Sequence, residues 1–440
     1  MSQAIELDAW DALPPRPSTP QLRGEPPKPT GQVDADPETF PLDRIDPSDG
    51  DLFAADQHHG FFARLRRDDP VHLTEHSHFG AYWSVTKYED IVSVEKDPET
   101  YSSARAITLS DPLPDSPMDS SFISMDGPTQ LAHRKTVAPA VGPRNLKRLE
   151  PIIRERVELI LDELPVGEEF DWVDRVSIEL TTSMLAALFD FPYEEQRRLT
   201  YWSDIATTPP NLGGPDNVTL ERRHEALREC LEVFEGLWKA RQGKGRGGDF
   251  VSLLADGAAT RDMSPRTYLA TLVLLIVGGN DTTRNSISGG VLALNQHPAE
   301  YDKLRADASV IPNMVSEMIR WQTPLSHMRR TATRDSELRG RSIKAGDKVA
   351  MWYVSANRDE DAITRPNEFL IDRPDARNHL SFGWGRHFCV GSRMAEMQVR
   401  VLWEEILKRY SAVEVVGEAA RIRSSFVNGI QKLPVRLHAI

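Results

Sequence analysis

The sequence has few cysteines, no long apolar run and no excess of basic residues. Cys230 and Cys389 are the only cysteines among its 440 residues, too few for a disulfide framework or a four-cysteine metal site. No stretch of about 20 apolar residues is present that could span a bilayer. The first residues lack the basic and apolar regions of a signal peptide. These absences predict a cytoplasmic protein without a transmembrane segment.

Acidic residues outnumber basic ones, 66 to 53, which gives a net charge of −13. Such a surface repels phosphate backbones, so no nucleic acid partner is expected. With 40% hydrophobic and 27% charged residues, the composition is that of a globular protein with a sizeable core. It excludes the collagen-like, disordered and small secreted classes.

The chain divides into an N-terminal arm and one domain. The first 40 residues hold eight prolines and little periodic hydrophobicity, so residues 1–45 are expected to form a proline-rich arm that buries no core of its own. Residues 46–440 form the domain, with a polar, proline-punctuated loop at 102–125. Helical periodicity dominates this domain, and its strands are brief: helices at 129–163, 170–190, 194–205, 219–241 and 265–294, and strands at 71–76, 81–88 and within 328–352. This pattern predicts a mainly α fold with a small β region.

A G-x-G-x-x-G string occurs at Gly243, Gly245 and Gly248. In a dinucleotide-binding fold this string leaves a strand and opens a helix. Here it leaves a predicted helix instead. The pattern therefore favours a flexible linker between two helices, with Asp249 as the N-cap of the second helix.

One cysteine stands in a glycine-rich string, Phe382–Gly391, that reads FGWGRHFCVG. Its glycines let the backbone approach a flat group closely. Cys389 immediately precedes an amphipathic helix, whose N-terminal dipole favours a thiolate. His387 lies two residues before it as a possible donor to an anion. A nucleophilic cysteine–histidine pair is the alternative, but residues two positions apart do not generally face each other, so the spacing favours a metal thiolate.

Two further strings carry chemistry-bearing side chains. Glu317 and Arg320 are three residues apart on a predicted helix, where an ordinary surface ion pair is the alternative interpretation. The string GGNDTT begins at Gly278 and contains Asp281 and Thr282. Taken locally it indicates a turn. Because apolar periodicity continues on both sides, it also fits a long buried helix, locally widened, that presents an acid beside an alcohol.

These three strings, F-G-x-G-x-H-x-C-x-G, E-x-x-R and G-G-x-D-T-T, occur in the order of a known family. Over about residues 45–440 the sequence resembles the cytochrome P-450 superfamily of haem–thiolate monooxygenases. The resemblance implies the cytochrome P-450 fold, a triangular-prism helical domain that holds haem b (iron protoporphyrin IX) between a distal and a proximal helix. Residues 46–440 would then be the catalytic domain.

The resemblance also implies roles for individual residues. Cys389 would be the axial thiolate and the metal ligand, which favours O–O cleavage. Phe382 and Gly391 of its loop, and Gly278 of the distal helix, would contact the haem. Asp281 and Thr282 would deliver protons to dioxygen.

A buried charge triad and a set of haem propionate partners are implied as well. Glu317, Arg320 and Arg373 would form the triad, which shapes the cysteine loop. The propionate partners would be His387, Arg330, Arg134 and Gln130. At the position of Gln130 many bacterial members carry a histidine, so this contact would bring no charge. Solvated surface arginines are the alternative for Arg134 and Arg330.

The distal string GGNDTTRNSISGG and the proline-rich extension are similar to those of the soluble bacterial alkane and fatty-acid terminal hydroxylases. This implies ω-hydroxylation of medium- or long-chain alkanes or fatty acids, with a sterol or terpene hydroxylase as the alternative. The implied substrate pocket is mostly apolar, as an alkyl chain requires. Its predicted lining residues are Leu274, Leu275, Val277, Leu325, Met328, Phe426 and Val427.

Electrons would come from a ferredoxin and an NAD(P)H-ferredoxin reductase, with O2 and a hydrophobic small molecule as substrates. Arg134, Lys135, Arg393 and Arg400 are candidates for a basic docking patch. A peroxygenase that uses hydrogen peroxide and a non-catalytic haem-binding sensor are the competing functions. Neither needs the proton-delivering pair Asp281–Thr282, so its presence favours a monooxygenase.

Overall fold

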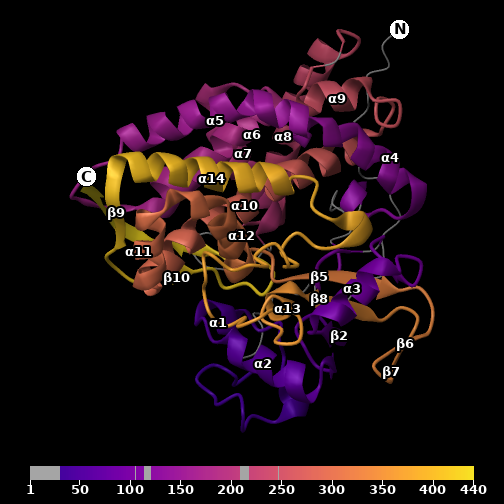
Figure 1. Cartoon of the computed structure of the whole chain (residues 1–440). Helices are drawn as coiled ribbons and strands as arrows, with labels where there is room; N and C mark the ends of the chain where they lie inside the picture. Colours follow the sequence, from indigo (N-terminus) through magenta and orange to yellow (C-terminus); the bar gives the residue numbers. More distant parts are fainter. Residues whose placement is uncertain (1–29, 105, 113–119, 209–217, 246) are drawn as a thin grey trace.

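The structure is a computed structural model, and it describes residues 30–104, 106–112, 120–208, 218–245 and 247–440. The long helices gather on one side of the molecule, and the main sheet lies on the other side with several short helices (Figure 1). The mainly α fold with a small β region is therefore confirmed.

Helices make up most of the described chain. They are α1 (Gly50–Ala54), α2 (His58–Asp68), α3 (Tyr88–Lys96), α4 (Gly127–Val137), α5 (Pro143–Asp162), α6 (Glu179–Phe189), α7 (Arg197–Thr207), α8 (Leu220–Arg241), α9 (Phe250–Asp256), α10 (Pro265–Gln296), α11 (Pro298–Ala306), α12 (Ile311–Gln322), α13 (Tyr353–Ala356) and α14 (Ser392–Arg409). A π-helical segment, Val173–Ile178, leads directly into α6. Asp249 caps α9 as predicted, because its side chain accepts from the backbone N–H of Ser252.

The strands form one larger sheet and three small ones. They are β1 (Val71–Thr74), β2 (Tyr82–Val85), β3 (Tyr101–Ser102), β4 (Glu169–Asp171), β5 (His327–Ala332), β6 (Ser336–Leu338), β7 (Arg341–Ile343), β8 (Lys348–Trp352), β9 (Tyr410–Val415), β10 (Ala420–Arg421), β11 (Ile430–Lys432) and β12 (Pro434–Ala439). The larger sheet has the order β1-β2-β8-β5-β3, in which only β2 and β8 pair in parallel. The small sheets are β4-β12-β9, β10-β11 and β6-β7.

The longest helix, α10, crosses the helical side of the molecule. It begins where the Ser264 side chain accepts from the backbone N–H of Thr267, with Pro265 at the first helical position. It ends at Gln296, with His297 as the C-cap just before Pro298. The turn interpretation at Gly278 is wrong, because α10 runs through this point as one continuous helix. Burial of the apolar residues on both sides outweighs the local turn signal.

Two glycines let α10 approach α12 closely. A Cβ placed on Gly289 would lie 2.0 Å from Oε1 of Gln322, and one on Gly290 would lie 2.6 Å from Sδ of Met318. Any larger residue at these positions would push the two helices apart or displace the partner side chains. α10 and α12 carry two of the three strings singled out in the sequence, so this contact sets their relative position.

The described parts of the predicted arm and of the 102–125 loop are tied to the domain. Gln32 is buried and exchanges two hydrogen bonds with the backbone of Asp46, at 2.9 and 2.7 Å. Residues 1–29 lie outside the described residues, as do 105 and 113–119 of the loop. In the loop, Leu109 and Phe122 are buried in the core. Within the described residues, no helix is long and apolar enough to cross a membrane.

Candidate active site

The cysteine loop connects a short 3-10 turn, Gly385–His387, to α14. The backbone N–H of Cys389 donates to the carbonyl oxygen of Phe382 at 2.8 Å, which closes the loop. Gly383 and Gly385 take positive φ values of 69° and 64°, which only glycine adopts without strain. The predicted need for glycine in this string is thereby explained at two positions.

Cys389 is a half-buried residue, and no side chain among the described residues donates a hydrogen bond to its thiol. Burial raises the pKa of Cys389, although backbone N–H groups of Gly391 and Ser392 and the charge of Arg134 act in the opposite direction. These donors and this cation favour a thiolate without producing one in the protein alone. A bound metal cation would supply the missing positive charge.

Glu317 lies between two buried arginines. Its carboxylate accepts from Arg320 at 2.7 Å through both oxygens, and from Arg373 at 3.0 and 3.3 Å. All three side chains are at most 1% exposed. Burial raises the pKa of Glu317, but the hydrogen bonds and charge of Arg320 outweigh it, with help from Arg373, and the pKa is lowered. The structure therefore joins the three predicted triad residues in one ionised cluster.

The arginines of this cluster also bind the backbone that leads to the cysteine loop. Arg320 donates to the carbonyl oxygens of Asn357 and Pro366 at 2.8 and 2.9 Å. Arg373 donates to those of Glu368 and Arg365 at 2.7 and 3.0 Å. An irregular segment has no helix or strand partner to donate hydrogen bonds to its carbonyl groups, so the arginines of the triad donate them instead. These hydrogen bonds tie the segment to α12.

One face of α10 is accessible in the middle of a helix that is otherwise buried. Every residue from Tyr268 to Val273 and from Thr283 to Val291 is buried. Between these two stretches, the accessible positions are Leu274, Val277, Gly278, Gly279 and Thr282. A Cβ on Gly278 would meet no atom within 4 Å. The spacing places Leu274, Gly278 and Thr282 on one stripe, hereafter the α10 stripe, which faces open space.

The predicted acid and alcohol point into different surroundings. The Thr282 hydroxyl donates to the carbonyl oxygen of Gly278 at 2.9 Å and belongs to the α10 stripe. Asp281 is buried, and its Oδ1 accepts from Arg284 at 2.9 Å and from Asn280 at 3.2 Å. Burial raises the pKa of Asp281 to about 6, against the lowering effect of Arg284. This carboxyl group therefore titrates close to neutral pH.

The predicted propionate partners gather around His387. Burial lowers the pKa of His387 to about 3, and the charges of Arg330, Arg134 and Arg386 add to the effect. The ring is therefore neutral, and its Nε2 lies 3.1 Å from the Ser103 hydroxyl. Three arginines close to one neutral histidine form a positive site that suits carboxylates.

Gln130 and Arg134 lie beside the same loop on α4. Gln130 donates weakly to the carbonyl oxygen of Arg386 at 3.4 Å, and its buried Oε1 has no partner. Arg134 donates to the carbonyl oxygen of Phe388. The buried amide of Gln130 is therefore not fully satisfied within the described chain.

The sequence did not indicate the partner of Arg330. This guanidinium donates through Nη2 to Oε2 of Glu95 at 2.9 Å, and Tyr353 donates its hydroxyl proton to Oε1 of the same carboxylate. All three side chains are buried. Glu95 lies on α3, 235 positions before Arg330, and no local pattern connects the two.

The predicted pocket residues fall into two groups. Leu274 and Val277 belong to the accessible part of α10, whereas Leu275 is buried in the main core. Leu325 and Val427 form an isolated antiparallel bridge. Their neighbours Met328 and Phe426 are partly accessible as well.

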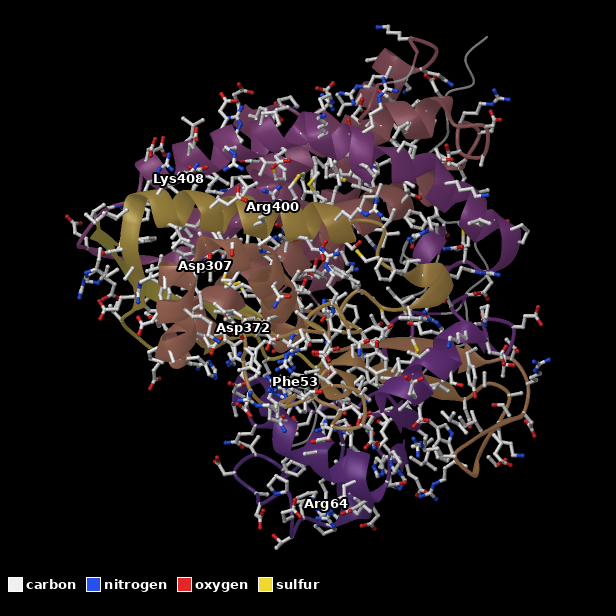
Figure 2. All side chains as sticks on the ribbon, viewed as in Figure 1. Phe53, Arg64, Asp307, Asp372, Arg400 and Lys408 are labelled. Carbon is white, nitrogen blue, oxygen red and sulfur yellow. The ribbon has the colours of Figure 1, made fainter. Side chains whose placement is uncertain are left out.

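The predicted basic docking patch is partly neutralised. Arg400 and Lys408 lie along α14 (Figure 2). Arg400 pairs with Glu150 at 2.6 Å and with Glu404 at 2.7 Å. No ion pair of Arg134 or Arg393 is found among the described residues, although Arg393 lies close enough to Glu396 for its charge to act on that carboxyl group.

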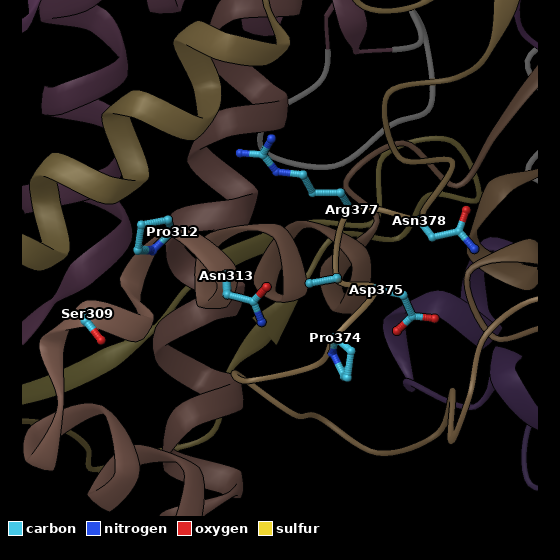
Figure 3. Close-up of a pocket in the computed structure, with 8 residues that line it drawn as sticks. Ser309, Pro312, Asn313, Pro374, Asp375, Arg377 and Asn378 are labelled. Atoms are coloured by element: carbon cyan, nitrogen blue, oxygen red, sulfur yellow. The ribbon is translucent and has the colours of Figure 1, made fainter.

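Two other features lie apart from the predicted site. A groove of about 520 Å³ runs between the start of α12 and residues 374–378 (Figure 3). None of the predicted site residues lines it. Asp56, His58 and His59 could offer three metal ligands, but Arg421 binds Asp56 at 2.6 Å, and Arg358 and Arg66 also lie near the histidines. These arginines disfavour a cation, so neither feature is assigned a function.

The geometry fits the haem that the resemblance implies. The α10 stripe offers an apolar face with open space beside Gly278. Cys389 offers a thiol whose pKa stays raised despite the nearby charge of Arg134, and the cluster around His387 offers cations for carboxylates. The unpartnered Oε1 of Gln130 marks the same region as incomplete without a further group.

Comparisons with known proteins agree with this interpretation. A family model described as Cytochrome P450 matches residues 59–431. The solved structure of cytochrome P450-153 from Novosphingobium aromaticivorans is 47% identical, with a TM-score of 0.84, and the match covers 89% of this chain and 99% of that one. Linalool 8-monooxygenase from Pseudomonas putida is 34% identical over 90% of this chain and 99% of the relative. The methyl-branched lipid omega-hydroxylase of Mycobacterium bovis is 31% identical over 91% and 96%. The predicted family is confirmed: the chain belongs to the cytochrome P450 family and is a haem b monooxygenase.

Proposed function

We propose that this monooxygenase hydroxylates the terminal methyl group of a medium- or long-chain alkane or fatty acid. The observation that carries the proposal is the α10 stripe, where Leu274 and Gly278, with Val277 beside them, offer an accessible apolar surface next to the Thr282 hydroxyl. An alkyl chain lying along it would meet only apolar or small groups. A relative named as an omega-hydroxylase supports the same chemistry.

Terminal selectivity requires positioning, because a terminal C–H bond is stronger than its neighbours. Reactivity alone would therefore favour internal carbons. A channel that admits the chain end-on brings the methyl group closest to the oxidant, and proximity of this kind contributes several kcal/mol. Leu325 and Val427, joined by their bridge, are proposed to form the opposite wall of this channel.

We assign the binding of the haem to residues that the structure brings together. Cys389 would hold the haem iron through its thiolate, and Arg330, Arg134, His387 and Gln130 would hold the haem propionates. When bound, the haem supplies the centre at which O2 is cleaved and a C–H bond is oxidised. The Glu317 triad touches neither substrate nor cofactor in this proposal and positions the cysteine loop.

Asp281 and Thr282 are the proposed proton-delivering pair. The overall reaction consumes O2, two electrons and two protons, places one oxygen atom in the product and releases the other as water. With a pKa of about 6, Asp281 can hold or release a proton near neutral pH. Asp281 is buried against Arg284, whereas the Thr282 hydroxyl is accessible. Thr282 is therefore proposed to donate the proton at the reaction centre, and Asp281 is proposed to supply the next proton to Thr282.

The family requires an external electron donor, and a ferredoxin with its NAD(P)H-dependent reductase is the proposed source. Arg134 and Arg393 are the candidates for its contact surface. Because Arg400 is already paired with two carboxylates, it contributes less than its charge alone implies.

A second candidate is hydroxylation of a terpene, favoured by the 34% identity to linalool 8-monooxygenase. Spectral titration of the purified holoenzyme with dodecane, dodecanoic acid, linalool and testosterone separates the candidates. A low- to high-spin shift with the linear chains, and product oxidised at the terminal carbon, supports the proposal. A shift with linalool alone would replace it by the terpene assignment, and a shift with testosterone alone would overturn both.

A further inference from the structure

We propose that Glu95 is a positioning residue that orients Arg330 at the edge of the haem site and offsets its charge, and thereby lowers the reduction potential of the haem. The inference concerns the cofactor alone. It is independent of the alkyl substrate proposed above.

The contacts of Glu95 are those of an anchored carboxylate. One oxygen accepts from Nη2 of Arg330 at 2.9 Å, and the other accepts from the Tyr353 hydroxyl. The side chains of Arg330 and Glu95 are 4% and 2% exposed. Burial and the nearby Glu95 charge raise the pKa of Tyr353 well above its ordinary range, so it remains a donor. Arg330 itself also donates to the carbonyl oxygen of Arg329 at 3.1 Å.

Glu95 also lies against the cysteine loop. It lies at the C-terminal end of α3, which packs on the cysteine loop. A Cβ on Gly385 would come 3.0 Å from the Glu95 carbonyl oxygen, and one on Gly383 would come 3.6 Å from its Oε1. The next residue, Lys96, lies over the Trp384 ring at 5.9 Å. Glu95 therefore contacts the segment that carries Cys389 as well as the predicted propionate partner Arg330.

This placement gives Glu95 two consequences. When the Glu95 carboxylate holds one side of the Arg330 guanidinium, the remaining N–H groups of Arg330 point in a fixed direction. This favours bidentate binding of a second carboxylate, such as a propionate. The negative charge also disfavours adding an electron nearby, because a buried pair is only weakly screened. Without Glu95, Arg330 would lie there as an uncompensated cation.

A merely structural role is the competing explanation, and three variants separate the two. Glu95→Gln removes the charge and keeps the shape. Glu95→Asp keeps the charge but shortens the reach to Arg330. Glu89→Gln is the matched control, because it removes one exposed acidic charge from the same helix.

The measurements are the reduction potential of each substrate-free holoenzyme and the rate of haem transfer to excess apomyoglobin. Glu95→Gln is expected to favour the ferrous state about tenfold, a positive shift of about 59 mV for a one-electron couple. Glu95→Asp should keep a potential close to that of the unchanged protein but release haem faster. Glu89→Gln should change neither quantity. Equal potentials for Glu95→Gln and Glu89→Gln would overturn the proposal, even if Glu95→Gln lost stability.

A double variant keeps the test decisive should Glu95→Gln retain no haem. Arg330→Gln alone is expected to lower the potential. Glu95→Gln combined with Arg330→Gln removes both charges of the buried pair and should return the potential towards that of the unchanged protein. A double variant with the potential of Arg330→Gln alone would show that Glu95 has no electrostatic effect on the haem, and the proposal would fail.

Discussion

Two buried carboxylates, Glu317 and Asp281, have the same local arrangement and opposite pKa shifts. Each accepts a hydrogen bond from an arginine three residues later on its own helix. Yet the pKa of Glu317 is lowered, whereas that of Asp281 is raised to about 6. Burial acts on both in the same direction, so the difference must lie in their other partners.

The other partners differ in number and in sign. Glu317 gains a second arginine, Arg373, and a backbone N–H from Leu370 at 2.9 Å. Among the described residues, Asp281 pairs with one arginine, Arg284, and shares it with Asp204, whose negative charge raises the pKa of Asp281 further. Complete pairing makes a carboxylate a structural anchor, while incomplete pairing leaves it able to exchange a proton. The comparison thus supports the two different roles proposed for one type of residue.

Glu317→Gln tests the anchor, and its effect should be the largest. It leaves Arg320 and Arg373 buried without a counter-charge, which costs about 3–5 kcal/mol of unfolding free energy. Urea unfolding and haem content measure the loss. Glu368→Gln, which removes a carboxylate from an exposed pair with Arg365, is the control and should behave like the unchanged protein. An equal, small effect of both variants would remove the distinction between the two sites.

The pH dependence of stability tests the other half of the comparison. Because the pKa of Asp281 rises from 3.8 to about 6 on folding, the folded state binds the extra proton. The Asp281 contribution is therefore fully present below about pH 4 and is lost as pH rises to about 6, by roughly 3 kcal/mol. Unfolding free energies of the unchanged protein minus those of Asp281→Asn, measured between pH 4.5 and 7.5, should fall with pH. A difference that rises with pH would mean that Asp281 is paired like Glu317.

Asp281→Asn should also slow turnover. Loss of a positioned proton donor reduces rates by about 100-fold, and an increased solvent isotope effect should accompany the loss. NAD(P)H-driven product formation with a competent electron supply measures both. Asp204→Asn keeps the Asp281 carboxyl group and should slow turnover much less. Similar losses in the two variants would assign the effect to the arrangement around Arg284 and not to proton transfer.

Thr282→Ala should have the smallest effect of the four, and it should appear in coupling. Haem and substrate binding should persist, but electrons should be diverted to hydrogen peroxide, so that product per NAD(P)H falls about tenfold, which is less than the typical loss for a removed acid–base group. The matched control is Thr283→Ala, since Thr283 is buried next to Thr282 and lies off the α10 stripe. Unchanged coupling in Thr282→Ala would mean that the pair has been misassigned.

Three local strings supplied most of the candidate site residues, because the chemistry of each string depends on near neighbours in sequence. The glycines before Cys389, the Glu317–Arg320 spacing and the acid next to Thr282 were all visible there. The sequence alone does not decide between a turn and a continuous helix at Gly278, because the local turn preference and the longer apolar periodicity disagree at that point. Only burial of α10 on both sides decides between them.

Ion pairs between residues far apart in the chain could not be predicted from the sequence. Glu95 and Arg330 are 235 positions apart, and a single glutamate in a helix carries no sign that it will be buried. For the same reason Arg400 was counted as a free basic residue, although it pairs with Glu150, 250 positions earlier. Which charges remain unpaired is a property of the folded packing and not of any segment.

The contact of Gly289 and Gly290 with α12 has a consequence for how this enzyme can change. It fixes the distal helix against the helix of the triad more than one turn beyond Thr282, with no side chain of α10 at the point of contact. Residues 274–278 take no part in that contact. Of these, the accessible Leu274, Val277 and Gly278 can vary in size without disturbing it, so new substrates could be accommodated by substitutions there while the contact between the two helices is inherited unchanged.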